Sequence, residues 1–166
     1  MKKILIAIDD KPGAQKVAET GHKLAKALKA RVTLAFVIAD LHHYTGPERP
    51  VMGFSGFTAD TAFRRTEEQY EQAIEYLNCV KQHLEDPSII TRVLEGSPVR
   101  SLLNLASKWK ADLIVAGSLR HHHPKEFSLG GVSQDLTHQS DFPVLIVPTE
   151  GSLVALESET DWFAYQ

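Results

Sequence analysis

Short apolar runs alternate with longer amphipathic segments along most of the chain. Runs of this length and composition are typical of strands that are buried on both faces of a parallel sheet. Parallel strands need a crossover between them, so helices between the runs predict an α/β fold. The runs are "KILIAID" (3–9), "RVTLAFVI" (31–38), "SIITRVLEG" (88–96), "ADLIVAG" (111–117) and "FPVLIVP" (142–148).

The first two amphipathic segments show apolar residues at three- and four-residue spacings, which is the pattern of a helix with one buried face. The first helix is expected to open at Pro12, and Gly21 lies on its apolar stripe, which predicts close packing against the sheet. The second is expected from about residue 59 to residue 84. The expected inner positions are Ala14, Val17, Ala18, Gly21, Leu24, Ala25 and Leu28 in the first helix, and Phe63, Tyr70, Ala73, Ile74, Leu77 and Val80 in the second.

Two further helices are expected. Ser97 and Pro98 form a good helix start, because serine can cap free amides and proline suits the first turn. The other helix is expected over residues 130–139. The buried face of the helix after Ser97 is expected at Val99, Leu102, Leu103, Ala106 and Trp109.

Two segments fall outside this pattern. Residues 39–58 form a long connection rich in glycine and proline, and a length of this kind is typical of a functional or a disordered loop. Residues 149–166 form an acidic tail that ends with Trp162, Phe163 and Tyr165. The tail is either a partly disordered end or a segment whose aromatic residues dock on the domain or a partner subunit. We therefore expect one domain over 1–148 and a tail over 149–166.

Composition narrows the classes of function. With 166 residues and 43% hydrophobic content, the chain suits a single globular domain. Charged residues make up 23% and the net charge is −3, which argues against both a disordered chain and a nucleic-acid partner. No apolar run approaches the roughly 20 residues of a membrane span. One cysteine, and two aspartates that interrupt the first apolar run, predict a cytoplasmic protein.

Candidate chemistry gathers where two strands end. In an open parallel sheet, ligands bind outside the carboxyl ends of strands whose crossovers leave in opposite directions. Asp9 closes the first strand, and Gly117 and Ser118 close the fourth. Residues 130–133 begin a helix, whose free amides and dipole favour an anion. The pattern indicates a phosphate site, although glycines that only permit tight turns would give the same sequence.

The segments "KKILIAID", "VLEGSPVRSLLNLASKWKADLIVAGS", "GGVS" and "FPVLIVP" follow one another in the order and spacing of a known family. Over nearly the whole of residues 1–148 the chain resembles the universal stress protein family. This resemblance implies a five-stranded parallel sheet in the order 3-2-1-4-5 with helices on both faces, an adenine-nucleotide alpha-hydrolase-like fold. Many members bind ATP through G-x2-G-x9-G-[ST], and a second group lacks this motif and binds no nucleotide.

The motif is degenerate in this chain. Gly117 and Gly130 match its first and third glycines at the right spacing, but Arg120 replaces the second glycine and Gly131 replaces the Ser/Thr. Ser133 stands where members often keep a hydroxyl. Loss of one hydroxyl removes a phosphate hydrogen bond worth on the order of 1 kcal/mol. Either Arg120 is a solvated loop residue, or its guanidinium replaces the missing contacts by pairing with a phosphate, with Lys125 as a possible second cation.

The resemblance also implies the binding residues. It places Asp9 near the ribose or the metal-bound phosphates and Val37 beside the adenine. Asp9 is thus a candidate ligand of Mg²⁺ in a magnesium-ATP complex, or a strand-end residue that caps the next turn. The expected nucleotide-binding residues are Asp9, Val37, Ala116, Gly117, Ser118, Arg120, Gly130, Gly131, Val132 and Ser133.

Histidines suggest a metal site only weakly. His121, His122 and His123 are consecutive, and consecutive residues rarely converge on one ion. His42 and His43 would have to join them from another loop, which nothing in the sequence requires. An ordinary loop explains these residues equally well.

Three functions remain open. The first is a regulatory protein of the stress response that binds ATP, and the second is a nucleotide-free dimeric interaction module. The third is an enzyme that uses ATP as a phosphoryl donor, which finds little support because the chain has no G-x-S-x-G or P-loop motif and Cys79 is expected to pack within a helix.

An apolar edge strand is a pairing hazard, and family members pair through it, so a homodimer through residues Pro143 to Val147 is expected. A further protein partner is also expected.

Overall fold

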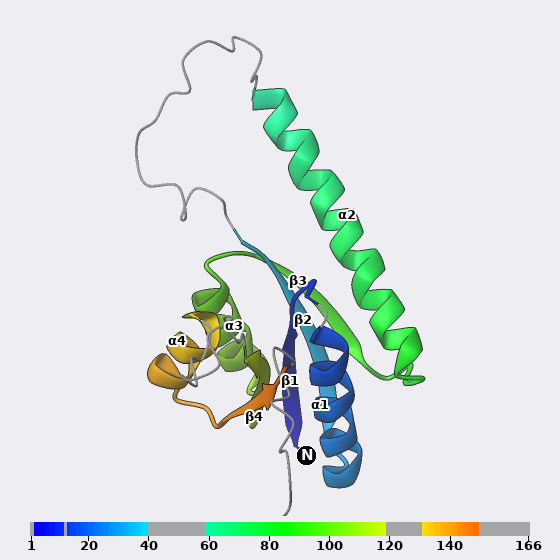
Figure 1. The fold of residues 1–166 in the computed structure, drawn as a ribbon, viewed down its shortest axis with the longest axis vertical. Helices are drawn as coiled ribbons and strands as arrows, with labels where there is room; N and C mark the ends of the chain where they lie inside the picture. Colours follow the sequence, from blue (N-terminus) through cyan, green and yellow to red (C-terminus); the bar gives the residue numbers. More distant parts are fainter. Residues whose placement is uncertain (1, 12, 40–58, 119–130, 150–166) are drawn as a thin grey trace, which may run out of the picture.

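The computed structural model describes residues 2–11, 13–39, 59–118 and 131–149. Five parallel strands form one sheet in the order β3-β2-β1-β4-β5, which confirms the expected topology (Figure 1). Four helices connect them. The strands are β1 (Lys3–Ile8), β2 (Arg31–Ala39), β3 (Ile90–Gly96), β4 (Leu113–Ser118) and β5 (Val144–Pro148), and the helices are α1 (Ala14–Leu28), α2 (Ala59–His83), α3 (Pro98–Trp109) and α4 (Gly131–Gln139).

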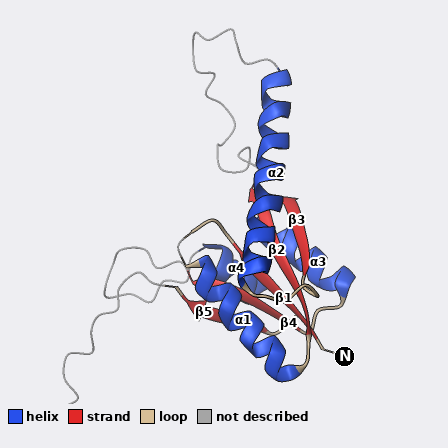
Figure 2. Cartoon of the chain, turned by 90° about the vertical axis from the view of Figure 1, so that its right-hand side faces the viewer, coloured by secondary structure: helices blue, strands red, loops and turns tan. Residues whose placement is uncertain are grey.

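Helices cover both faces of the sheet and bury two apolar clusters (Figure 2). On β1, successive side chains point to opposite faces, so Ile4 and Ile6 join the cluster under α1 and α2. Leu5 joins the cluster under α3 and α4. The near-continuous apolar run of β1 is therefore explained by burial on both sides.

Gly21 on α1 packs tightly against the sheet, as its place on the apolar stripe predicted. A Cβ added there would lie 2.7 Å from Cδ1 of Ile6, closer than a normal contact. The helix begins at Ala14 rather than at Pro12, which lies outside the described residues. Leu28 was expected on the buried stripe but is 39% exposed, because it is the last residue of α1.

The start of α3 lies where the sequence predicted, with Ser97 as the N-cap and Pro98 as the first helical residue. The expected side-chain cap is absent, because the Ser97 side chain makes no capping hydrogen bond and its carbonyl instead accepts the N–H of Ser101 at 2.9 Å. Leu102 is buried as expected. Leu103 and Trp109, two other positions of the expected face, are only half-buried.

The inner face of α2 is shorter than its apolar pattern predicted. Ala73 and Leu77 are buried against the sheet, but Tyr70 and Ile74 are 39% and 40% exposed. Figures 1 and 2 show that the N-terminal part of α2 extends beyond the sheet, so its amphipathic pattern continues past the surface that could cover it. Ile74 lies between the buried Ala73 and Leu77 in sequence, so its exposure places it at the margin of the buried stripe. The side chain of Phe63, from the same predicted face, is outside the described part of the structure.

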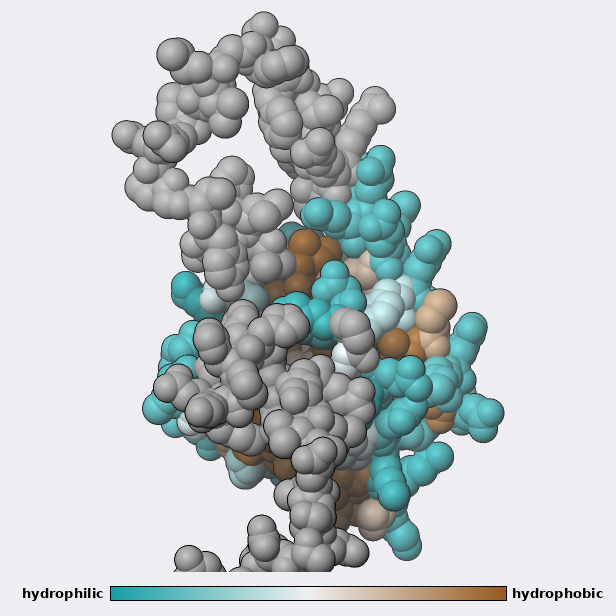
Figure 3. All heavy atoms as spheres, viewed as in Figure 1, coloured by the Kyte–Doolittle hydropathy of each residue, from teal (hydrophilic) through white to brown (hydrophobic). Residues whose placement is uncertain are grey.

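Cys79 on α2 is exposed, so the prediction that it packs in the interior was wrong. It lies on the outer side of the helix, where a helical residue two positions from the buried Leu77 is turned away from the sheet. In Figure 3 the right-hand edge of the molecule, where Figure 1 places α1 and α2, is largely hydrophilic. Among the described residues, no helix has both the length and the apolar composition needed to cross a membrane.

Several predictions fall on residues outside the described part of the chain. These are the loop after β2, the docking of the tail, and the roles of the loop histidines and Lys125. The residues concerned are 40–58, His121, His122, His123, Lys125 and 150–166.

Candidate functional site

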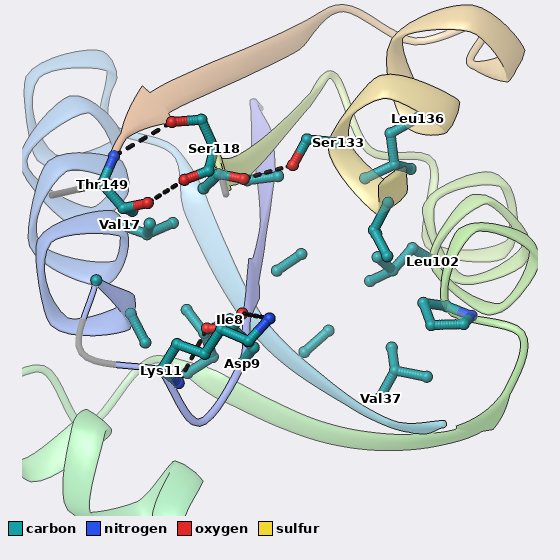
Figure 4. Close-up of a pocket in the computed structure, with 18 of the residues that line it drawn as sticks. Ile8, Asp9, Lys11, Val17, Val37, Leu102, Ser118, Ser133, Leu136 and Thr149 are labelled. Carbon is teal, nitrogen blue, oxygen red and sulfur yellow. Dashed lines mark hydrogen bonds and ion pairs between the residues drawn. The ribbon is translucent and has the colours of Figure 1, made fainter. Parts of the chain in front are cut away.

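A pocket of about 270 Å³ lies at the carboxyl ends of β1 and β4 (Figure 4). The crossover after β1 runs through α1 on one face of the sheet, and the crossover after β4 runs through α4 on the other. This divergence leaves a crevice at the point where ligands bind in open parallel sheets. Its lining residues are Ala7, Ile8, Asp9, Asp10, Lys11, Gly13, Ala14, Val17, Ala35, Val37, Pro98, Leu102, Ala116, Gly117, Ser118, Val132, Ser133, Leu136 and Thr149.

Most of the residues that the sequence proposed for nucleotide binding meet in this pocket. Gly131 is the first residue of α4 and does not itself line the pocket. Arg120 and Gly130 lie outside the described residues. Those that line the pocket are Asp9, Val37, Ala116, Gly117, Ser118, Val132 and Ser133.

One wall of the pocket is apolar. Ala35 and Val37 come from β2, Pro98 and Leu102 from the start of α3, and Leu136 from α4. Ala35, Leu102 and Leu136 belong to the buried cluster under α3 and α4, so rigid core packing supports this wall. Such a surface suits the face of a planar, weakly polar ring.

Hydroxyl groups tie the end of β4 to its neighbours. The Ser133 hydroxyl on α4 donates to the carbonyl of Gly117, and the Thr149 hydroxyl donates to the carbonyl of Ser118. The Thr149 N–H also donates to Oγ of Ser118 at 3.3 Å. These bonds hold the carboxyl end of β4 between α4 and the residue that follows β5. The Ser133 proton is therefore used within the protein, while its oxygen keeps lone pairs that can accept.

Packing alone explains why Gly117 is glycine. An added Cβ would lie 2.9 Å from Cγ2 of Val17 and 3.1 Å from Cγ2 of Thr149. At Gly131, in contrast, an added Cβ would meet no atom of the described residues within 4 Å. Packing thus disfavours a side chain at the first motif glycine, whereas the described residues leave room for a hydroxyl at the position that lost its Ser/Thr.

Asp9 marks the polar side of the pocket. Its Oδ1 accepts the backbone N–H of Lys11 at 3.2 Å, and its Oδ2 lies 3.9 Å from the Lys11 ammonium. Asp9 therefore caps the turn after β1, which is the structural role that the sequence left open. Lys11 was not predicted as a site residue, although its place two residues after Asp9 is the spacing of such a turn.

Tyr76 connects α2 to this turn. Its hydroxyl donates to the carbonyl of Asp9 at 2.8 Å, and its ring meets Phe36 of β2 edge-on at 5.8 Å between centroids. Burial raises the pKa of Tyr76, and the charges of Asp9 and Asp10 add to that rise. The turn that carries Asp9 is thereby bonded to α2 through Tyr76, whose ring in turn packs against β2.

The expected magnesium ion at Asp9 fits this arrangement poorly. Magnesium in nucleotide sites is held by one or two carboxylates together with phosphate oxygens and waters. Here both carboxylate oxygens of Asp9 face Lys11, and an ion at Oδ2 would lie beside a like charge. Within residues 2–11, 13–39, 59–118 and 131–149, no three metal-ligating side chains come together.

Comparison with known proteins agrees with the fold. Residues 1–148 match the Universal stress protein family. The chain is 32% identical over 165 residues to Stress response protein NhaX of Bacillus subtilis (strain 168), a match that covers 87% of this chain and 96% of NhaX.

Solved structures show the same architecture. The hypothetical protein MJ0577 superposes with a TM-score of 0.68 at 24% identity, over 91% of this chain and 98% of that one. A universal stress protein in complex with cAMP superposes with a TM-score of 0.62 at 21% identity, over 90% of this chain and 98% of that one. A universal stress protein from Archaeoglobus fulgidus in complex with dAMP superposes with a TM-score of 0.55 at 15% identity, over 88% of this chain and 97% of that one. With the family match over residues 1–148 and the similarity to NhaX, this chain belongs to the universal stress protein family.

Proposed function

We propose that this protein is a regulatory universal stress protein that binds an adenine nucleotide in the pocket between β1 and β4. The convergence of seven of the predicted site residues on one pocket carries the proposal. Structural relatives in complex with cAMP and with dAMP support an adenine nucleotide as the ligand class. The expected ligand is ATP or one of its lower phosphates.

The pocket suggests how the nucleotide lies. The adenine ring packs on the apolar wall beside Val37, where burial of a planar ring is favourable. The ribose and the phosphate attached to it lie toward Asp9 and its neighbour Lys11, and the outer phosphates extend from there. These outer phosphates lie toward the start of α4, where the first amides have no partner within the helix and the dipole favours negative charge. Arg120 pairs with a phosphate in this proposal, as its sequence position suggests.

The proposed activity is binding and not turnover. The described residues that line the pocket include no histidine or cysteine, and the Ser133 proton is engaged by the Gly117 carbonyl. An activated nucleophile needs an adjacent general base or a lowered pKa. Nucleotide occupancy would thus act on the stress response through conformation or through a protein partner.

A nucleotide-free interaction module is the second candidate. The observation that favours it is that the carbonyls at the end of β4 already accept hydrogen bonds from the hydroxyls of Ser133 and Thr149, without any ligand. Gly117 is likewise required for packing against Val17 and Thr149, whether or not a phosphate binds. In this case the pocket would be a structural remnant.

Two measurements distinguish these candidates. Mass spectrometry of the denatured purified protein would identify any nucleotide that it carries. Titration calorimetry of the stripped protein with ATP, ADP and AMP would give affinities. Gly130→Val should weaken binding severely and Arg120→Ala about tenfold or more, while Thr137→Val on the exposed face of α4 should not change it. No binding of any of the three at millimolar concentration would favour the interaction module.

A further inference from the structure

Lys11 is the basic residue in the described lining of the pocket, which otherwise carries the two carboxylates Asp9 and Asp10. It stands in the turn between β1 and α1, and its side chain is about half-exposed, like that of Asp9. A pocket with two carboxylates repels a phosphate unless a cation stands beside them. Lys11 is in position to supply that cation.

The contact between Lys11 and Asp9 leaves the ammonium available to a ligand. The 3.9 Å between Nζ and Oδ2 is an ion-pair distance and exceeds that of a hydrogen bond. Lysine carries three N–H donors on a flexible stem, so it can keep its attraction to Asp9 and still donate to another oxygen. The Lys11 backbone N–H meanwhile holds Asp9 through Oδ1 at 3.2 Å, which keeps the two side chains together.

The same geometry disfavours a metal ion at this place. A divalent cation bound to Asp9 would lie within a few ångströms of the Lys11 ammonium, where the two like charges repel each other. An ammonium and a magnesium ion are alternative means of neutralising a carboxylate next to a phosphate. This chain carries the ammonium.

We propose that Lys11 takes the place of a divalent cation at Asp9, so that the pocket binds phosphorylated adenine nucleotides without magnesium. This inference rests on the proposed nucleotide function and specifies the ionic form of its ligand. Lys11 donates to a phosphate oxygen, Asp9 positions Lys11, and a nucleotide that lacks phosphate gains nothing from the pair.

The test is titration calorimetry of stripped protein with ATP, AMP and adenosine, in magnesium and in EDTA. For wild type, the ATP and AMP affinities should agree within about twofold between the two buffers. Lys11→Met should weaken both nucleotides about tenfold in EDTA and leave adenosine unchanged, because one charge-assisted bond is lost. Magnesium should then recover part of the ATP affinity, because Asp9 is no longer beside an ammonium.

Two variants serve as controls. Lys11→Arg keeps the positive charge and should retain most of the affinity, whereas Lys16→Met removes an exposed α1 lysine that does not line the pocket and should change nothing. Wild-type binding that requires magnesium, or an unchanged Lys11→Met affinity in EDTA, would overturn the assignment of Lys11 while leaving the nucleotide function intact. No binding of any nucleotide in either buffer would instead overturn the nucleotide function itself, and the role of Lys11 with it.

Discussion

The imidazole Nε2 of His22 on α1 lies 2.9 Å from Oδ2 of Asp86 in the turn between α2 and β3. His22 is only 5% exposed, on the buried stripe of α1. The other oxygen of Asp86 accepts the Ser88 N–H at 3.0 Å and the Ser88 hydroxyl at 2.6 Å. The Ser88 bonds first, and then His22, lower the pKa of Asp86 from 3.8 to about 2. This pair joins α1 to the turn that follows α2, and both helices lie on the same face of the sheet.

Asp86→Asn should lower the free energy of unfolding at neutral pH by roughly 2 kcal/mol, the equivalent of the lowered pKa. Because the pKa in the folded state lies below its ordinary value, the stabilisation is present above about pH 4. It is lost as the pH falls from about 4 to about 2. Urea denaturation at a series of pH values should show this slope in wild type and a flatter profile in the variant. An equal loss in Asp135→Asn, an exposed α4 residue, would contradict the role of the pair.

Gly117→Ala should destabilise the fold, because its Cβ would lie 2.9 Å from Cγ2 of Val17. Overpacking of this kind costs about 1–3 kcal/mol. Val17→Ala removes the obstructing methyl, so the double variant should lose less stability than the two single changes added together. Thermal denaturation of the wild type, the two single variants and the double variant gives the coupling free energy between the two positions. Strict additivity would show that the two residues do not compete for the same space.

Gly131→Ser should strengthen nucleotide binding by about fivefold, since it restores one hydroxyl hydrogen bond worth on the order of 1 kcal/mol. No atom of the described part of the chain lies within 4 Å of a Cβ added at Gly131, so the serine side chain clashes with none of these residues. Gly131→Ala is the matched control, because it adds the Cβ without the hydroxyl and should leave the affinity near that of wild type. Calorimetric titration with ATP compares the three proteins. Equal ATP affinities for the serine and alanine variants would show that the hydroxyl forms no hydrogen bond with the nucleotide.

The β5 edge should mediate a homodimer. The strand lies at one end of the sheet order, and Ile146 is half-buried against the cluster under α3 and α4. Ile146→Lys should shift the protein to monomer in sedimentation velocity, with circular dichroism as the check on folding. Val147 is unsuitable for this test, because it is buried in the other cluster. Thr91→Lys on β3, the opposite edge, should not alter assembly, and a wild-type monomer at tens of micromolar would refute the dimer.

Truncation after Glu150 should lower the melting temperature if Trp162, Phe163 and Tyr165 dock on the domain or on a partner subunit. Burial of two aromatic rings would contribute a few kcal/mol before the cost of ordering the segment. Differential scanning calorimetry of the full and the truncated chain measures this. A fully exposed Trp162 emission spectrum together with identical melting curves would rule out docking.

The sequence by itself determined the layered α/β architecture, because apolar runs and helical stripes report which faces must be buried. Five parallel strands between helices confirm this, as does the close approach of Gly21 to Ile6, whereas the order of the strands was what the family resemblance implied. The position of the pocket also followed from sequence. Asp9 and Ser118 end parallel strands, and the carboxyl ends of parallel strands meet at one edge of a sheet.

Only the tertiary structure decided which residues of each apolar stripe are buried. The α2 pattern predicted that Tyr70 and Ile74 are buried, but periodicity gives neither the width of the helix face that the sheet covers nor the point where the sheet ends. Contacts between distant residues were equally hidden. His22 meets Asp86, and Thr149 meets Ser118, because helix packing and strand pairing bring them together from far along the chain. A local pattern carries no information about such contacts, since their partners are chosen by the packing of whole elements.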